Sequence, residues 1–383
     1  MSVIKTGTTS TTGYIVESDT NGNLVIQTGS TPTTALTLNS DQTATFAQSV
    51  NIPNTFGFKN RIINGGMVID QRNAGASVTP TNGQYTLDRW QAIISQTSKF
   101  TVQQNAGAVT RPVGFTNYLG LTSSSTYSVL TGDYFALYQG IEGFNCADLG
   151  WGTANAQPVT LSFWVRSSLT GTFGGSLKNN STRSYPFTYT ISSANTWEYK
   201  TITVVGDTTG TWDTNNSLGM YVSFGLGVGS TFSGTAGAWA GSNFVSATGA
   251  TSVVGTNGAT FYITGVQLER GSTATSFDFR PYGTELMLCQ RYYYKVTTYP
   301  LGYSISAGDL YAGQIKLPVT MRSAPSGDAG ATFQVSSGNA GTVNIVNTSG
   351  GATTVDAVNF SNAASNWTTN VRVGVSIGLT AEL

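Results

Sequence analysis

VTLSFWVR, residues 159–166, alternates apolar residues with residues of other kinds over its whole length. Successive side chains of a β-strand point to opposite faces, so Val159, Leu161 and Phe163 share one face. Trp164 and Arg166 share the other. The stretch therefore predicts a strand with one face in a hydrophobic core and an aromatic residue on the opposite face.

The same period of two recurs along the chain. It is found in MYVSFGLGV (220–228) and in VRVGVSIGL (371–379), and FYITGVQLE (261–269) also predicts a short strand. Several such segments separated by Gly-rich turns are typical of two antiparallel sheets packed face to face. We therefore expect an all-β protein whose central part is a β-sandwich, with the jelly roll as the favoured variant.

Composition supports strands and excludes several functional classes. Only 9% of the 383 residues are charged, against about 25% in an average soluble protein, and the formal net charge is zero. A chain without a basic surplus is not expected to bind nucleic acid or an anionic membrane surface. No window approaches the ~20 apolar residues of a membrane span, and the first residues lack the apolar core of a secretory signal.

The chemistry available to the chain is narrow as well. It contains no histidine, which excludes Ser-His-Asp and Cys-His catalysis and all His-ligated metal sites. Its two cysteines, Cys146 and Cys289, lie far apart in the sequence. We expect buried thiols rather than a disulfide, although a disulfide remains open.

Residues 1–57 have the pattern of short strands and tight turns. Leu24–Gln27 follows an Asn-Gly pair, and Ala35–Leu38 and Thr43–Phe46 flank a polar turn. Hairpins of this size are marginal in water by themselves, so we expect an N-terminal stem that intertwines with copies of itself. A leader without fixed structure is the alternative.

The stretch FYITGVQLERGSTATSFDFRPYGTELMLCQRYYYK, residues 261–295, marks a boundary. Its first residues predict a closing strand, RPYG predicts a hinge, and residues 284–295 form the most helix-like window of the chain. We expect a jelly roll over 58–285 and a small C-terminal β-sandwich, the tip, over 286–383. The boundary stretch itself is expected to bind no ligand.

The order of several motifs resembles a known family. They are NRIINGGMVIDQRNAG, YTLDRW, YFALYQGIEG, VTLSFWVRSS, WEYKTITVVGDTTGTW and FYITGVQLERGSTATSFDFRPYGTEL. This order, over about residues 59–285, resembles a module of bacteriophage tail fibres that is similar to the carbohydrate-binding jelly rolls of glycoside hydrolases. The N-terminal hairpins resemble stem segments of tail fibres.

The resemblance implies a homotrimeric receptor-binding protein of the virion, made in the host cytoplasm without a signal peptide. It would join other tail or baseplate proteins through its N-terminus and adhere non-covalently to a host cell-surface polysaccharide. Two alternatives remain: a polysaccharide-depolymerising tail enzyme, and a purely structural spacer or decoration protein.

The resemblance also implies sugar binding by aromatic rings, whose apolar faces suit the C–H face of a pyranose. Trp151, Trp212 and Trp239 lie in Gly-rich turns, where burial is harder to arrange. The remaining candidates are Trp164 with Arg166 on one strand face, and Arg183, Tyr185 and Asn180 in a polar loop. Trp90 and Trp197 are expected in the core, and Trp367, Tyr303 and Tyr311 are candidates in the C-terminal part.

Catalysis is not expected. Glycoside hydrolysis uses two carboxylates about 5 to 9.5 Å apart, for which Asp70 with Asp88 and Asp207 with Asp213 are the candidates. Aspartates in Gly/Thr turns most often cap those turns. No cofactor is expected, but a structural Ca²⁺ held by carboxylates remains open; the candidates are Asp148, Glu142 and Asp278.

Overall fold

The structure is a computed structural model and describes residues 22–28, 33–41, 43–46, 58–303, 311–327, 332–335, 338–342, 344–345, 357–362 and 372–383. The chain divides into two compact units, Met1–Thr55 and Phe56–Leu383. Among the described residues, regular structure consists of strands, one α-helix and three short 3-10 helices, which confirms the predicted all-β class. The predicted boundary between 285 and 286 stays a prediction.

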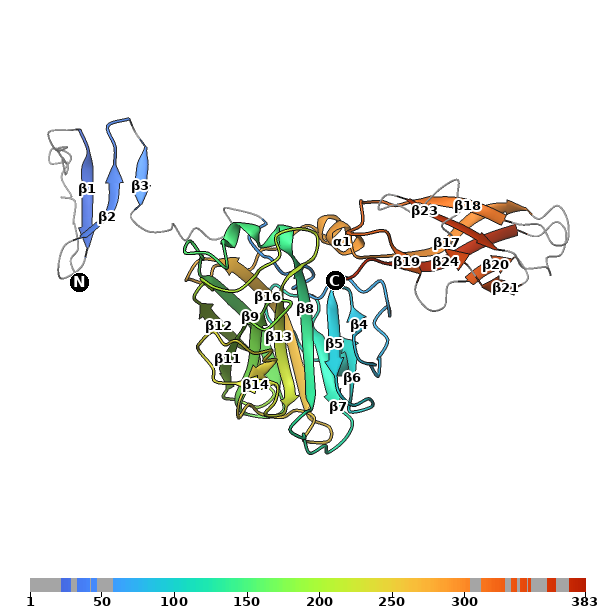
Figure 1. The fold of residues 1–383 in the computed structure, drawn as a ribbon, viewed down its shortest axis with the longest axis horizontal. Helices are drawn as coiled ribbons and strands as arrows, with labels where there is room; N and C mark the ends of the chain where they lie inside the picture. The colour runs from blue at the N-terminus through green and yellow to red at the C-terminus, as the bar shows by residue number, and fades with distance from the viewer. Residues whose placement is uncertain are drawn as a thin grey trace, which may run out of the picture. The chain divides into compact units, whose positions relative to one another are not determined.

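The N-terminal unit contains a three-stranded antiparallel sheet in the order β1 (Leu24–Thr28), β2 (Thr33–Leu38) and β3 (Ala44–Phe46) (Figure 1). Leu36 pairs with Phe46 across the predicted polar turn, which confirms that hairpin. None of the side chains described in this unit is buried, and Val25 and Ile26 are 42% and 46% exposed.

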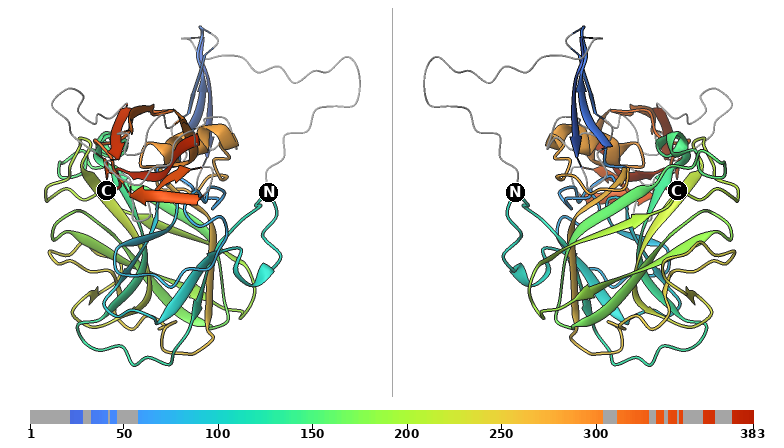
Figure 2. Two further views of the ribbon diagram at one scale, coloured as in Figure 1. Left: turned by 90° about the vertical axis from the view of Figure 1, so that its right-hand side faces the viewer. Right: turned by 90° about the vertical axis from the view of Figure 1, so that its left-hand side faces the viewer.

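The second unit contains a β-sandwich of two antiparallel sheets, seen from two sides in Figure 2. The six-stranded sheet has the order β11 (Ser184–Ile191), β10 (Gly171–Lys178), β13 (Leu218–Val228), β8 (Tyr134–Glu142), β5 (Trp90–Ile94) and β4 (Gln84–Leu87). The five-stranded sheet has the order β12 (Glu198–Val204), β9 (Val159–Ser167), β16 (Thr260–Arg270), β7 (Leu119–Ser123) and β6 (Phe100–Gln104).

Shorter elements complete the sandwich. β14 (Ser233–Gly234) and β15 (Ser246–Ala247) form a small parallel pair. The 3-10 helices are η1 (Ala106–Ala108), η2 (Gly143–Asn145) and η3 (Ala147–Leu149). The two-sheet sandwich predicted from the sequence is thereby confirmed.

One continuous core fills the space between the two sheets, and the predicted alternation is responsible for it. Val159, Leu161, Phe163 and Val165 are fully buried in that core. Phe163 meets Phe224 of the facing sheet edge to face, with ring centroids 5.0 Å apart. Burial of each such side chain contributes about 1.5 to 3 kcal/mol to the free energy of unfolding.

The two tryptophans expected in the core differ in burial. Trp90 opens β5 and is fully buried, which confirms its predicted place. Trp197 is half-buried beside a smaller cluster, and its indole N–H donates to the carbonyl oxygen of Thr110 at 2.8 Å.

The predicted helix is present but shorter than expected. Helix α1 (Tyr282–Gln290) begins after Pro281 and ends before the tyrosine run, whereas the sequence predicted a helix to residue 295. Tyr293 and Tyr294 instead open β17 and pair with Thr380 and Leu379. The aromatic run favours a strand, and its partner strand lies far away in the sequence, so local pattern alone placed the helix end too late.

The C-terminal strands form two further sheets. One contains β17 (Tyr293–Tyr303), β24 (Arg372–Thr380), β20 (Thr332–Val335) and β21 (Gly338–Thr342), with β19 (Ser326–Gly327) paired to β24. The other contains β18 (Tyr311–Lys316), β23 (Ala357–Asn362) and β22 (Asn344–Ile345). The strand predicted at 371–379 is confirmed. Trp367 and the side chains of Tyr303 and Tyr311 lie outside the described residues.

The last residues of the chain contact the sandwich. Arg89 is 1% exposed, and its guanidinium pairs with the carboxylate of Glu382. Arg72 binds the same carboxylate at 2.6 Å. Cys146 and Cys289 are free buried thiols, as predicted. Within the described part of the chain, no helix has the length and apolar character needed to cross a membrane.

Candidate functional site

A groove of about 570 Å³ lies on the outer face of the five-stranded sheet. This size is within the range of small-molecule sites, about 300 to 1,000 Å³. We call it the aromatic groove, and its lining residues come from three strands and two loops: Ser162 and Trp164 of β9, Tyr199 of β12, Gly265 of β16, residues 113–115, and residues 274–277 with Phe279.

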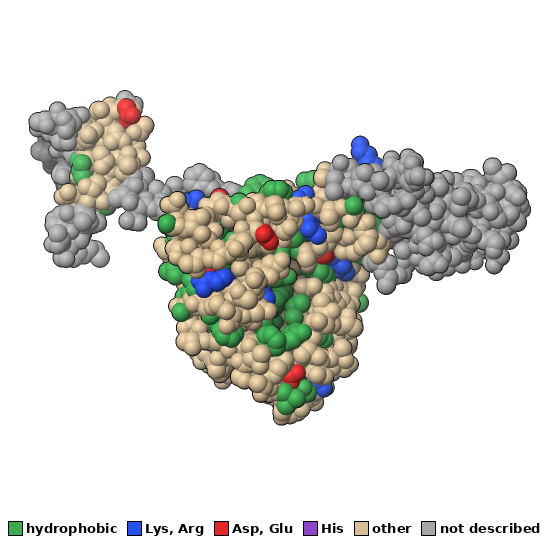
Figure 3. Space-filling model, viewed as in Figure 1, with side chains coloured by type: hydrophobic (Ala, Val, Ile, Leu, Met, Phe, Trp, Pro, Cys, Tyr) green, Lys and Arg blue, Asp and Glu red, His purple; other side chains and the backbone are tan. Residues whose placement is uncertain are grey.

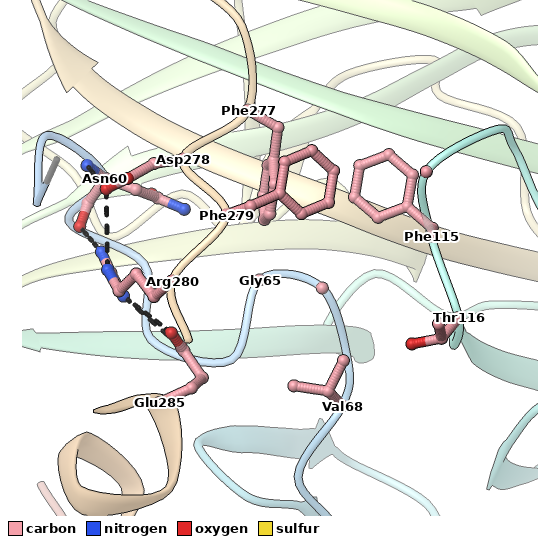
Figure 4. A pocket seen from close by; sticks show the side chains of 12 residues that line it. Asn60, Gly65, Val68, Phe115, Thr116, Phe277, Asp278, Phe279, Arg280 and Glu285 are labelled. Carbon is pink, nitrogen blue, oxygen red and sulfur yellow. Dashed lines mark hydrogen bonds and ion pairs between the residues drawn. The ribbon is translucent and has the colours of Figure 1, made fainter. Parts of the chain in front are cut away.

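Three phenylalanines form the wall at one end of the aromatic groove. Phe115 approaches from the loop before β7, and Phe277 and Phe279 approach from the segment after β16, as Figure 4 shows. Their ring centroids are 4.8 to 5.3 Å apart. A smaller cavity of about 180 Å³ continues behind them to Asn60 and Arg280.

Aromatic surface is accessible along the aromatic groove. Phe279 is 57% exposed and Tyr199 is 43% exposed, although both are large apolar rings. Tyr199 packs against the half-buried Trp164 with centroids 5.4 Å apart. Exposed rings gathered in one concave site can bind a flat ligand that has an apolar face.

A glycine makes room for the rings. Gly265 lies at a β-bulge where the pairing of β16 with β9 shifts between Thr264 and Gln267, and its φ is +61°. A Cβ atom at this position would lie 2.6 Å from the ring of Phe115 and 3.2 Å from that of Trp164. Glycine is therefore required here both by its left-handed backbone and by the space that the two rings fill.

Arg280 anchors the segment that carries Phe277 and Phe279 (Figure 4). Its guanidinium lies 3.6 Å from the carboxylate of Asp278 and 3.3 Å from that of Glu285. It also donates to the backbone carbonyl oxygens of Ile62 and Asn60. Because this nearly buried network uses side chains other than the rings, it holds the rings in place and leaves their surfaces available.

The neighbouring wall is held onto β16 by a second polar network. The amide oxygen of Gln267 accepts the N–H of Asp278 at 2.8 Å, and its amide nitrogen donates to Glu269 at 2.8 Å. Glu269 in turn accepts the backbone N–H of Thr275 at 2.8 Å and its hydroxyl at 2.6 Å. Residues 275–278 are thus fixed against the sheet.

Two of the predicted candidates lie on this face of β9, but they have different surroundings. Trp164 lines the aromatic groove, in agreement with the prediction that it faces away from the core. Arg166 is not among the lining residues. Its Nε donates to the carbonyl oxygen of Asn195 at 3.0 Å, and its guanidinium lies over the ring of Tyr262.

The three tryptophans predicted in Gly-rich turns converge in one cluster. The centroids of Trp151, Trp212 and Trp239 are 4.7 to 5.6 Å apart, and each pair of rings meets edge to face. Every indole N–H donates to a backbone carbonyl oxygen. Trp151 is only 7% exposed, so the expectation that its turn leaves it accessible was wrong. Three loops pack there and enclose it.

The predicted polar-loop residues border this indole cluster. Tyr185 is 8% exposed and packs against Trp239 with centroids 5.3 Å apart. The guanidinium of Arg183 lies 5.7 Å from the centre of the Trp239 ring. Asn180 is exposed in the same loop. Five of the seven predicted ligand-binding residues are therefore neighbours, but away from the aromatic groove.

Arg183 also binds Asp207 through two parallel hydrogen bonds of 2.8 and 2.6 Å. Burial alone would raise the pKa of Asp207, but the bonds from Arg183 and Thr209 hold that pKa below its usual value. The carboxylate also accepts the N–H of Thr209 and so caps its own turn, as the sequence predicted for this residue. Asp207 is thus held as an ionised structural group.

Asp70 and Asp88, and the three carboxylates considered for Ca²⁺, have structural partners too. Asp70 accepts the N–H groups of Asn73 and Gly75, and Asp88 accepts from Gln71. The three residues considered for Ca²⁺ each face an arginine: Asp148 faces Arg61, Glu142 faces Arg291 and Asp278 faces Arg280. Within the described residues, no group of three or more acidic or cysteine side chains could hold a metal ion.

Sequence reasoning missed most of the aromatic groove. The stretch 261–295 was expected to bind no ligand, yet it contributes Phe277 and Phe279 to the lining. The spacing Phe-x-Phe at 277–279 could have indicated two rings on one side of an extended segment. Phe115 and Tyr199 carry no comparable signal, because only the fold brings them to this face.

No protein-family model and no curated protein matches this chain. Among solved structures, the enzymatically active domain of tailspike protein 4 of bacteriophage CBA120 is similar at 14% identity and a TM-score of 0.31, over 56% of this chain and 22% of that one. A protein from Bacteroides thetaiotaomicron described as sugar-binding is similar at 12% identity and a TM-score of 0.35, over 55% of this chain and 100% of that one.

A family 11 carbohydrate-binding module from Clostridium thermocellum, in complex with a β-1,3-1,4-mixed-linked tetrasaccharide, is similar at 11% identity and a TM-score of 0.26. That likeness covers 52% of this chain and 97% of the module. At such identities and TM-scores, these likenesses assign no function to this chain.

Proposed function

We propose that this chain is a receptor-binding protein of a bacteriophage tail fibre that adheres non-covalently to a glycan of the host cell surface. The aromatic groove carries the binding part of this proposal, because exposed Phe279 and Tyr199 flank Trp164 in a concave site. The assignment to a phage virion, and to the jelly-roll variant of the sandwich, rests on the sequence motifs described above.

Sugar recognition fits the chemistry of the aromatic groove. The C–H face of a pyranose stacks on aromatic rings, while its hydroxyls need polar partners nearby. Aromatic rings form the floor and wall of the groove, and Thr275 and Ser276 add polar surface beside them. A neutral, hydroxyl-rich ligand also matches the absence of Asp, Glu, Lys and Arg from the groove lining.

Binding is favoured over hydrolysis by the state of the carboxylates. A glycosidase places two carboxylates on either side of the scissile bond. Asp278 and Glu285, which line the smaller cavity, both pair with Arg280. A depolymerase remains the alternative, and release of reducing ends from host envelope polysaccharide would identify it.

We further propose a homotrimer with an intertwined N-terminal stem that joins the virion. The three-stranded N-terminal sheet buries none of its described side chains, and Leu38 is 41% exposed. A sheet without a core is stable only when another surface covers it, and copies of the same chain supply one. Three weak glycan sites on one fibre would then gain strength by avidity.

The test is a titration of the full-length protein with fragments of host envelope polysaccharide, followed by calorimetry. Wild type is expected to bind, and Phe279→Ala and Trp164→Ala are expected to lose at least about tenfold in affinity. Tyr282→Ala is the matched control, because Tyr282 is 64% exposed and does not line the groove.

The outcomes separate the alternatives. Equal binding by wild type and both groove variants would place the glycan elsewhere. Failure of the wild-type protein to bind any host polysaccharide, or whole host cells, would favour the structural spacer.

A further inference from the structure

A second pocket lies on the opposite side of the sandwich, on the outer face of the six-stranded sheet. It has a volume of about 290 Å³ and is lined by Ile93, Tyr134, Tyr138, Lys178, Tyr221, Phe232, Asn243 and Val245. Figure 3 shows hydrophobic side chains gathered near the middle of this face, where Figure 1 draws β8 and β13. We call this site the lysine pocket.

Lys178 is the unusual member of the lysine pocket. Two cationic residues are buried in the described part of the chain, Arg89 and Lys178. Arg89 pairs with Glu382, whereas Lys178 has no carboxylate partner. Lys178 is 8% exposed, and its ammonium donates to the amide oxygen of the exposed Asn243 at 2.5 Å. A buried ammonium without a counter-charge is costly, which suggests that a ligand supplies one.

Aromatic rings surround that ammonium. Its nitrogen lies 5.5 Å from the centre of the Tyr138 ring and 5.1 Å from that of Tyr221. Tyr134 and Phe232 form an edge-to-face pair at 5.1 Å in the same lining. The pocket thus combines one cation with several ring surfaces, and burial lowers the pKa of Lys178 to about 8, which leaves it mostly charged at pH 7.

The wall of the lysine pocket is fixed before any ligand arrives. Residues 242–246 cross the outer face of the sheet, and three serine hydroxyls donate to carbonyl oxygens of that segment: Ser176 to Phe244, Ser184 to Ser242, and Ser223 to Val245. Gly174 and Gly225 permit the close approach, because a Cβ at either would lie 2.5 Å from the hydroxyl oxygen of Ser246. A preformed wall lowers the entropic cost of binding.

We infer that the lysine pocket binds the carboxylate of an acidic sugar residue, with Lys178 as its counter-charge and the tyrosine rings against the sugar. A carboxylate can bind the ammonium by a charge-assisted hydrogen bond while Asn243 remains in place. The site is separate from the aromatic groove, so the two can be tested independently.

The experiment titrates the full-length protein with methyl β-glucuronide, and with methyl β-glucoside as the neutral match, at pH 7. We expect the glucuronide to bind at least about tenfold more tightly, the gain typical of a hydrogen bond to a charged group. Lys178→Met should abolish this preference, Lys178→Arg should retain much of it, and Phe279→Ala should leave it unchanged.

Three results would overturn the inference. Equal affinity of the wild-type protein for the two glycosides would exclude a role for the ammonium, and so would an undiminished preference in a folded Lys178→Met variant. If acetate bound as tightly as the glucuronide, the sugar ring would contribute nothing to affinity and the proposed contact with the tyrosine rings would be excluded. Loss of polysaccharide binding in Phe279→Ala with the glucuronide preference intact would separate the two sites.

Discussion

Replacing Lys178 by methionine should stabilise the protein. Burial lowers the pKa of this ammonium from 10.5 to about 8, so the charged form is less favourable in the folded state than in the unfolded chain. A shift of one pKa unit corresponds to about 1.4 kcal/mol of folding free energy. The shift of Lys178 therefore corresponds to about 3 kcal/mol. Methionine keeps a similar unbranched side chain among the same rings and carries no charge.

The pH dependence gives the sharper test. Below pH 8 the ammonium is charged in both states, and the folded state bears the full cost of its burial. Between pH 8 and 10.5 the folded protein releases the proton before the unfolded chain does, so the contribution of Lys178 to stability becomes less unfavourable as the pH rises. The free energy of unfolding of Lys178→Met should accordingly exceed that of the wild type by about 3 kcal/mol at pH 7 and by about 1.5 kcal/mol at pH 9.5.

The assay is urea unfolding of both proteins at pH 7 and pH 9.5, followed by near-ultraviolet circular dichroism. Lys200→Met serves as control, because Lys200 pairs with Glu198 at 2.6 Å and its loss should bring no gain. A Lys178→Met variant less stable than wild type at pH 7 would refute the reasoning. A margin of the same size at both pH values would also refute it, since the gain would then come from packing and not from the charge.

Further predictions concern the groove, the indole cluster, the C-terminal residues and assembly. Gly265→Ala should lower the free energy of thermal unfolding by about 2 to 4 kcal/mol and weaken glycan binding, because φ at this position is +61° and the new Cβ would overlap Phe115. An unchanged melting temperature would contradict this prediction. Trp212→Ala should lower stability by about 2 to 3 kcal/mol but leave polysaccharide affinity unchanged in calorimetry, since its ring packs edge to face against Trp151 and Trp239. Glu382→Gln should lower the free energy of unfolding in urea by about 3 to 5 kcal/mol, because Arg89 would be left buried without its carboxylate partner. Asp148→Asn, which breaks an exposed ion pair with Arg61, should lower it by less than about 1 kcal/mol. Light scattering of the purified full-length protein should give the mass of a trimer, and a monomer would contradict the proposed stem.

The sequence by itself determined which residues face the core. Val159, Leu161, Phe163 and Val165 alternate with other residues, and all four are fully buried. This property is local: the direction of a strand side chain depends on its position in a two-residue period, and burial of one face follows from its apolar character. Turn chemistry and strand alternation are both local, so the pairing of Leu36 with Phe46 and the strand at 371–379 could be predicted correctly.

The tertiary structure decided which residues meet. Phe115 and Phe277 are 5.1 Å apart although more than 150 residues separate them, and their contact depends on β7 lying beside β16. Trp151 is buried because three loops converge on it, and helix α1 ends early because β17 pairs with a strand near the C-terminus. Strand order and loop packing depend on free energies summed over distant contacts, which a local pattern does not contain.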